Sequence, residues 1–190
     1  IVAFWGVLTR MRRNDPERHA KAIRALIKDL TPIEKLRLYD KGDFPERLTR
    51  QEERLLLQNL PLLYKETLSY PNYEGRFGAS ARELKTILLN AAHDEHFDFL
   101  NPESVFLEIE NLLGSKSVYP FLKQEIVGKF HDHKAFLEQT RDLYLDLIDD
   151  EIRESMGLTA NHSELDLFTR YVDHVSHWVK KEKLWDPVAN

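Results

Sequence analysis

The chain has 190 residues, 42% hydrophobic and 31% charged, which suits one domain or two small helical domains and excludes wholesale disorder. The absence of cysteine excludes a disulfide scaffold, a cysteine zinc ribbon and a thiol nucleophile. A net charge of -5 disfavours nucleic acids and anionic lipids as partners, and no apolar run approaches the length of a membrane span. We therefore expect a cytoplasmic protein with no nucleic-acid or membrane partner.

Residues 1–5 are all apolar and are typical of a buried helix. The chain starts at Ile1 instead of Met, and no charged region with a cleavage site, as in a signal peptide, precedes the apolar residues. We therefore expect a fragment of a longer protein, with part of the chemistry outside these residues.

Signals for the start of a helix recur along the chain. Asp15 followed by Pro16 predicts a helix over about 16–30, because aspartate caps helices and proline suits the first helical position. The other start signals are Thr31 with Glu34, Thr49 with Glu52, Asn101 with Pro102, and Asn161 with Glu164. Pro61 is expected to kink or end the helix in which it lies.

Apolar residues at helical spacing predict two long helices near the C-terminus, over about 136–156 and 165–179. No period-2 run of β-branched residues predicts a strand. We therefore predict an all-α fold, a multi-helix array divided into residues 1–98 and 99–190. Loops are expected at 40–48, 69–79, 113–117 and 124–132.

The segment 75–84 is the most informative part of the sequence. Ser80 and Glu83 have the spacing of a capping box, so a helix is expected to begin at Ala81. Arg82 then lies in the first helical turn, where its charge opposes the helix dipole. A helix N-terminus that carries an arginine can bind a phosphate, and the alternative is a capped helix whose Arg82 pairs with a nearby carboxylate.

Residues 78–84 resemble the sensor-2 motif of AAA+ ATPases, in which a lid helix presents an arginine to the terminal phosphate of the nucleotide. Longer stretches are similar to the PrkA family of bacterial serine protein kinases. They are residues 70–80, 85–92, 144–158 and 171–183, with weaker support from 15–18 and 30–35.

The resemblance implies an AAA+ lid-like region at 1–98 and a C-terminal helical region at 99–190. It also implies that Arg82, assisted by Arg76, contacts a nucleotide bound to an AAA+ core elsewhere in the same protein. ATP and Mg²⁺ would then be cofactors of the full-length kinase only. The implied partners are that core, protein substrates and, in a homo-oligomer, a second copy of the chain.

The motifs of phosphoryl transfer are missing from these residues. No G-x-x-x-x-G-K-[ST] loop, H-R-D loop or D-F-G triplet occurs, so we assign no catalytic residue. Two alternatives stay open. The chain could be a non-catalytic helical interaction module, or, less favoured, a metal-dependent bundle enzyme.

The hypothesis of a metal site rests on two histidine pairs, His93/His96 and His174/His177. The two histidines of each pair share one face of a helix. The Glu-x-x-His pattern of di-metal bundles is absent, so solvated histidines and no metal are the better expectation. In the run His131-Asp132-His133, we interpret Asp132 as a helix cap. The tryptophans at positions 5, 178 and 185 are expected in the core or at an interface with the ATPase core.

Overall fold

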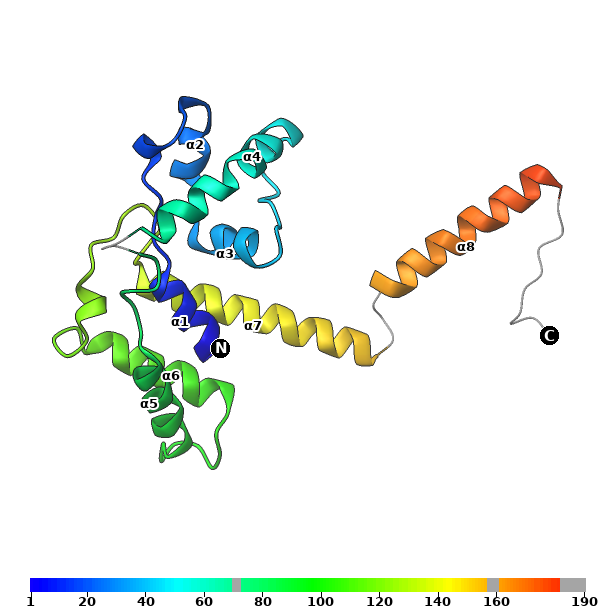
Figure 1. Cartoon of the computed structure of the whole chain (residues 1–190). Coiled ribbons are helices and arrows are strands. Elements are labelled where there is room, and N and C mark those ends of the chain that lie inside the picture. Colours follow the sequence, from blue (N-terminus) through cyan, green and yellow to red (C-terminus); the bar gives the residue numbers. More distant parts are fainter. Residues whose placement is uncertain (70–72, 157–160, 182–190) are drawn as a thin grey trace. The chain divides into compact units, whose positions relative to one another are not determined.

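The computed structural model describes residues 1–69, 73–156 and 161–181, without the side chains of 161–167 (Figure 1). These residues form helices and no strand, apart from an isolated bridge between Val127 and Phe130, which confirms the all-α prediction. The α-helices are α1 (Val2–Arg10), α2 (Lys21–Asp29), α3 (Pro32–Asp40), α4 (Arg50–Thr67), α5 (Ala81–Ala92), α6 (Pro102–Gly114), α7 (His133–Ser155) and α8 (Asn161–Lys180). Two 3-10 helices are η1 (Pro16–Arg18) and η2 (Pro120–Lys123).

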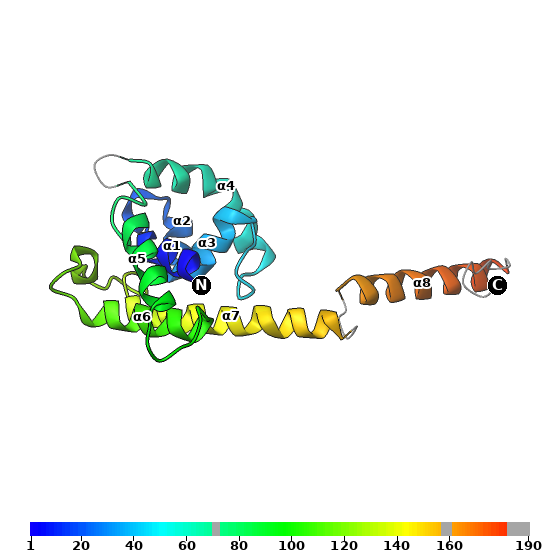
Figure 2. The ribbon, with the colours of Figure 1, turned by 90° about the horizontal axis from the view of Figure 1, so that it is seen from below.

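The chain divides into two units, Ile1–Asp142 and Leu143–Asn190, which are described separately. Within the first unit, α5 and α6 lie side by side (Figures 1 and 2). They stand on either side of the expected boundary between 98 and 99. The division into an AAA+ lid-like region and a C-terminal region stays a prediction.

The prediction of one helix over 16–30 is wrong. This stretch is split into η1 and α2, because the backbone is extended at His19, whose side chain turns inward to Glu66. Pro61, where a kink or an end is expected, does not end its helix, since α4 continues through it. Pro61 lies on an exposed part of the helix, and Leu57, whose carbonyl loses its N–H partner to the proline, is also exposed, so water can satisfy that carbonyl.

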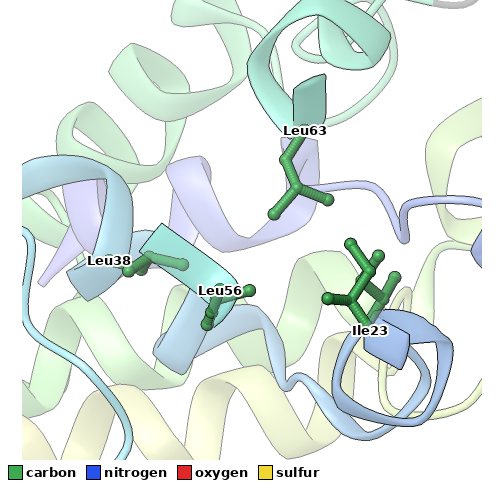
Figure 3. Packing of buried hydrophobic residues seen from close by; sticks show 5 residues of the cluster. Ile23, Leu38, Leu56 and Leu63 are labelled. Atoms are coloured by element: carbon green, nitrogen blue, oxygen red, sulfur yellow. The ribbon is translucent and has the colours of Figure 1, made fainter. Parts of the chain in front are cut away.

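One hydrophobic core joins α2, α3 and α4. Ile23 and Ile27 of α2 meet Leu38 of α3 and Leu56 and Leu63 of α4 (Figure 3). All five side chains are almost completely buried. Ile23 and Ile27 are four residues apart and Leu56 and Leu63 are seven apart, so each pair lies on one face of its helix and packs against Leu38 of α3.

A second set of buried residues surrounds α1, η2 and the start of α7. Trp5 is fully buried, as expected for a core tryptophan, and packs edge-on against Phe121 with the ring centroids 6.2 Å apart. The ring of His133 lies between Phe121 and Phe136, at centroid distances of 5.3 and 5.8 Å. This aromatic row fixes α1 against the first turn of α7.

The second unit contains the later turns of α7 and the helix α8. Along α8 a stripe of large apolar side chains is exposed, and it includes Trp178. The third tryptophan, Trp185, lies outside the described residues. None of the described helices combines the length and the hydropathy needed to cross a membrane.

Candidate functional site

The start of α5 has the capping box that the sequence predicts. The Ser80 hydroxyl accepts a hydrogen bond from the backbone N–H of Glu83 at 3.3 Å, and the Glu83 carboxylate accepts one from the N–H of Ser80. Helix α5 therefore begins at Ala81, and Arg82 occupies its first turn. A cation at this position opposes the helix dipole at a cost of about 0.3–1 kcal/mol.

The side chain of Arg82 is exposed to solvent. Within the described residues its guanidinium forms no ion pair or hydrogen bond, and the nearest carboxylate in sequence, that of Glu83, is held in the capping box. The alternative, in which Arg82 pairs with a nearby carboxylate, therefore finds no partner in this part of the chain. Arg82 is free to contact a group supplied from outside.

Arg76 lies in the loop before α5 and is also exposed. Its guanidinium carbon is 5.1 Å from the centroid of the Phe77 ring, which is a cation–π distance. The structure thus places both predicted arginines on the surface of one short segment, 76–82. Their role in nucleotide binding stays a prediction.

This segment is held in place by the end of α1. The guanidinium of Arg10 donates hydrogen bonds to the carbonyl oxygens of Gly75, at 2.7 Å, and Ala79, at 2.8 Å. In return, the N–H of Gly75 donates to the Arg10 carbonyl at 3.3 Å, and the N–H of Ala79 donates to the Thr9 hydroxyl at 2.9 Å. Both ends of the loop are therefore fixed to one turn of α1.

Gly78 allows the loop to lie this close to α1. Its φ of +134° falls in a region that L-residues rarely adopt. A Cβ added here would lie 2.8 Å from the Thr9 carbonyl oxygen and 2.5 Å from Cγ of Arg10. Glycine is required at this position by both the backbone conformation and the available space.

A buried ion pair fixes the beginning of the same loop. The ammonium of Lys35 in α3, which is only 1% exposed, donates to both carboxylate oxygens of Glu74 at 2.8 Å and to the carbonyl of Arg12 at 2.5 Å. Glu74 also accepts the backbone N–H of Arg12 at 2.8 Å. Burial lowers the pKa of Lys35, while the charge of Glu74 opposes that shift.

Sequence reasoning missed the contacts by which Arg10, Lys35 and Glu74 hold this loop. A local signal existed only for Lys35, which lies between the buried residues Pro32 and Leu38 at helical spacing and thus on the inner face of α3. A charged residue on such a face needs a buried partner. That partner is 39 residues away, and no local pattern identifies it.

The histidine pairs do not form a metal centre in the described part of the chain. No group of three or more His, Asp or Glu side chains there could hold a metal ion. His93 and His177 each contact a carbonyl oxygen four residues earlier in their own segments, and His96 contacts Asp94. Asp132 accepts the N–H of Ala135 at 3.1 Å and so caps α7 as predicted.

Comparison with known proteins gives one family match. Residues 33–190 match the family described as PrkA serine protein kinase C-terminal domain, a range that contains Arg76, Arg82 and helices α4–α8. No curated protein matches the chain. No solved structure matches it either. The family match covers most of the chain, which therefore belongs to the PrkA serine protein kinase C-terminal domain family.

Proposed function

We propose that this region acts as the lid of an ATP-dependent serine protein kinase, with Arg82 contacting the terminal phosphate of a nucleotide on an AAA+ core of the same protein. Arg76 assists by facing the same phosphates. ATP and Mg²⁺ are cofactors of the full-length kinase, and the 190 residues alone bind ATP weakly or not at all.

The observation that carries the proposal is the exposed guanidinium of Arg82 in the first turn of a capped helix, which has no ion pair or hydrogen bond within the described residues. Backbone N–H groups at a helix start and a nearby arginine both favour phosphate oxygens. The positive charge of Arg82 at the start of α5 is unfavourable against the helix dipole, and the negative charge of a bound phosphate would offset that cost.

The rigid attachment of segment 75–79 to α1 also supports this role. Catalysis by a positioned charge requires a fixed geometry, since misplacement of about 1 Å can cost a factor of about 100 in rate. The hydrogen bonds of Arg10 restrict the loop that leads into Arg82. The lid would then move as one body with its arginine.

The test is to replace Arg82 by Ala in the full-length protein and to measure ATP hydrolysis and serine phosphorylation. An arginine that contacts the transferred phosphate contributes about 10³-fold or more in related phosphoryl transfers, so we expect turnover to fall at least about tenfold. Lys85→Ala is the matched control, because Lys85 is an exposed cation on the same helix, one turn later. Unchanged turnover in a folded Arg82→Ala protein would refute the proposal.

A second candidate, a non-catalytic interaction module, is favoured by the apolar stripe on α8. Its exposed members are Phe168, Tyr171, Val172, Val175, Trp178 and Val179. Exposed apolar stripes on amphipathic helices commonly contact partner proteins, which here would be protein substrates, the AAA+ core or a second copy of the chain. In that case Trp178→Ala lowers substrate phosphorylation or self-association, whereas Arg82→Ala leaves ATP hydrolysis unchanged.

A further inference from the structure

The apolar stripe on α8 has the spacing of a coiled-coil seam. Phe168, Val172, Val175 and Val179 follow one another at intervals of four, three and four residues. Steps that alternate between three and four residues keep side chains on one line facing a second helix, and these four residues occupy positions a and d of the heptad abcdefg. The pattern therefore indicates that this face of α8 packs against another helix.

Two aromatic residues widen the stripe along one side. Tyr171 and Trp178 directly precede Val172 and Val179, so both occupy position g of the heptad. All six residues of the stripe are exposed, and the exposed fraction of the rings is 64% for Phe168, 66% for Tyr171 and 82% for Trp178. Contiguous apolar patches of this kind on a protein surface commonly mark an interface with another protein.

The area of the stripe matches the needs of a contact between two copies. An aromatic side chain buries about 150–250 Å² when it is covered, so the three rings at these exposed fractions present about 400 Å² per copy. With the valines added, two stripes packed face to face would bury more than about 1,000 Å² in total. That is the size at which a specific protein interface becomes plausible.

The charge pattern favours an identical partner. The stripe itself is uncharged, and the e positions on its other side, Thr169 and Ser176, are also uncharged. The charged residues within 168–181 all lie outside positions a, d, e and g, and they are Arg170, Asp173, Lys180 and Lys181. Charges at e and g select a different chain as partner in coiled coils. Their absence here lets two identical stripes meet without like-charge repulsion.

We propose that α8 is a self-association helix, whose apolar stripe packs against the same stripe of a second copy of this chain. A two-fold axis relates the copies, so that each uses the same face. This inference rests on the second candidate of the proposed function and names the partner of its interaction surface. It does not depend on the nucleotide role of Arg82.

The first test measures the mass of the 190-residue chain by analytical ultracentrifugation over a wide range of concentrations. We expect the mass to rise from that of one chain to that of two. Val175→Lys places a charge in the seam and should weaken the association by about tenfold or more. His174→Lys is the matched control, because it introduces the same side chain one residue earlier, at an exposed position outside the seam, and should leave the association unchanged.

Loss of folding would not explain such a result. Lysine has a higher helix propensity than valine, and Val175 is not part of a buried core, so Val175→Lys should keep the helix content measured by circular dichroism. A second measurement locates the contact. In protein labelled with 5-fluorotryptophan, the ¹⁹F signal of Trp178, identified by its loss in Trp178→Phe, should shift with concentration. The signal of Trp5, which is fully buried, should not shift.

Two results would overturn the proposal. A chain that stays monomeric at every concentration would show that the stripe does not pair with itself. Association that Val175→Lys leaves unchanged, or that does not move the Trp178 signal, would place the contact elsewhere. The second candidate function fails separately: if the chain is monomeric but Trp178→Ala in the full-length protein still lowers substrate phosphorylation, the stripe contacts a different partner.

Discussion

Arg10 at the end of α1 donates a hydrogen bond to the carbonyl of Ala79, 69 residues later, at 2.8 Å. A second bond from the same guanidinium, to Gly75 at 2.7 Å, spans the loop before α5. The family match begins at residue 33, so this contact joins the segment before the matched range to the loop that carries Arg76. The position of the candidate site therefore depends on residues on both sides of residue 33.

We predict that Arg10→Ala destabilises the first unit by about 1–3 kcal/mol, because it leaves two partly buried carbonyl groups without their donor. Urea unfolding followed by circular dichroism measures the loss. Arg18→Ala is the control, since among the described residues Arg18 makes only an exposed pair with Asp15, at 3.4 Å, and should change stability by less than about 1 kcal/mol. Equal losses of unfolding free energy for the two variants would mean that the hydrogen bonds of Arg10 do not stabilise the fold.

Gly78→Ala should destabilise the protein more than Gly42→Ala. Both glycines have a positive φ. At Gly42 the +75° lies near the left-handed helical region, where an L-residue costs about 1–2 kcal/mol, whereas the +134° of Gly78 lies outside that region and strains an L-residue further. At Gly78 the new Cβ also overlaps the Thr9 carbonyl, whereas at Gly42 it meets no atom within 4 Å. Thermal unfolding of the two variants compares their losses of stability, and equal losses would contradict an added cost from the close contact with α1.

The helix starts were largely predictable from sequence because a capping box involves residues only three positions apart. Thr31, Thr49, Ser80 and Asn101 all cap helices in this way. The family was also identified from sequence, and the match over 33–190 confirms it. Local patterns therefore determined the fold class and the place of α5 along the chain.

The attachment of the candidate site could not be predicted from sequence. The contact between Arg10 and Ala79, like that between Lys35 and Glu74, joins residues far apart in the chain. Their positions depend on how α1 and α3 pack, which is decided by the buried cores and has no periodic signature. The exposure of Arg82 is also a consequence of tertiary packing, and its nucleotide role stays a prediction.

The ion pair between Lys35 and Glu74 should behave as a coupled unit. Glu74→Gln leaves the buried Lys35 ammonium without a counter-charge, so we expect a loss of about 3–5 kcal/mol. Lys35→Met should also destabilise, because it removes the ammonium that contacts both oxygens of the Glu74 carboxylate at 2.8 Å. The double variant is predicted to lose clearly less than the sum, and additive losses in urea unfolding would show that the pair is not coupled.

The last prediction concerns acid stability and the carboxylate of Glu66 in α4. Burial alone would raise the pKa of Glu66, but hydrogen bonds outweigh it and lower the pKa below its usual 4.5. They come from His19 at 2.8 Å, the backbone N–H of Asp15 at 2.8 Å and Asn14 at 2.7 Å. A carboxyl group whose pKa is lower in the folded state adds stability above its unfolded pKa and loses it as the pH falls through the folded pKa.

We therefore expect the free energy of unfolding to fall as the pH is lowered from about 5 towards 3, in part because of Glu66. Glu66→Gln should be less stable than the parent at pH 7, and the difference should shrink across the same acid range. Glu53→Gln is the control, since Glu53 lies on the same helix and makes no side-chain hydrogen bond or ion pair within the described residues. A stability difference for Glu66→Gln that stays constant from pH 7 to pH 3 would show that the lowered pKa of this carboxyl group does not contribute to folding.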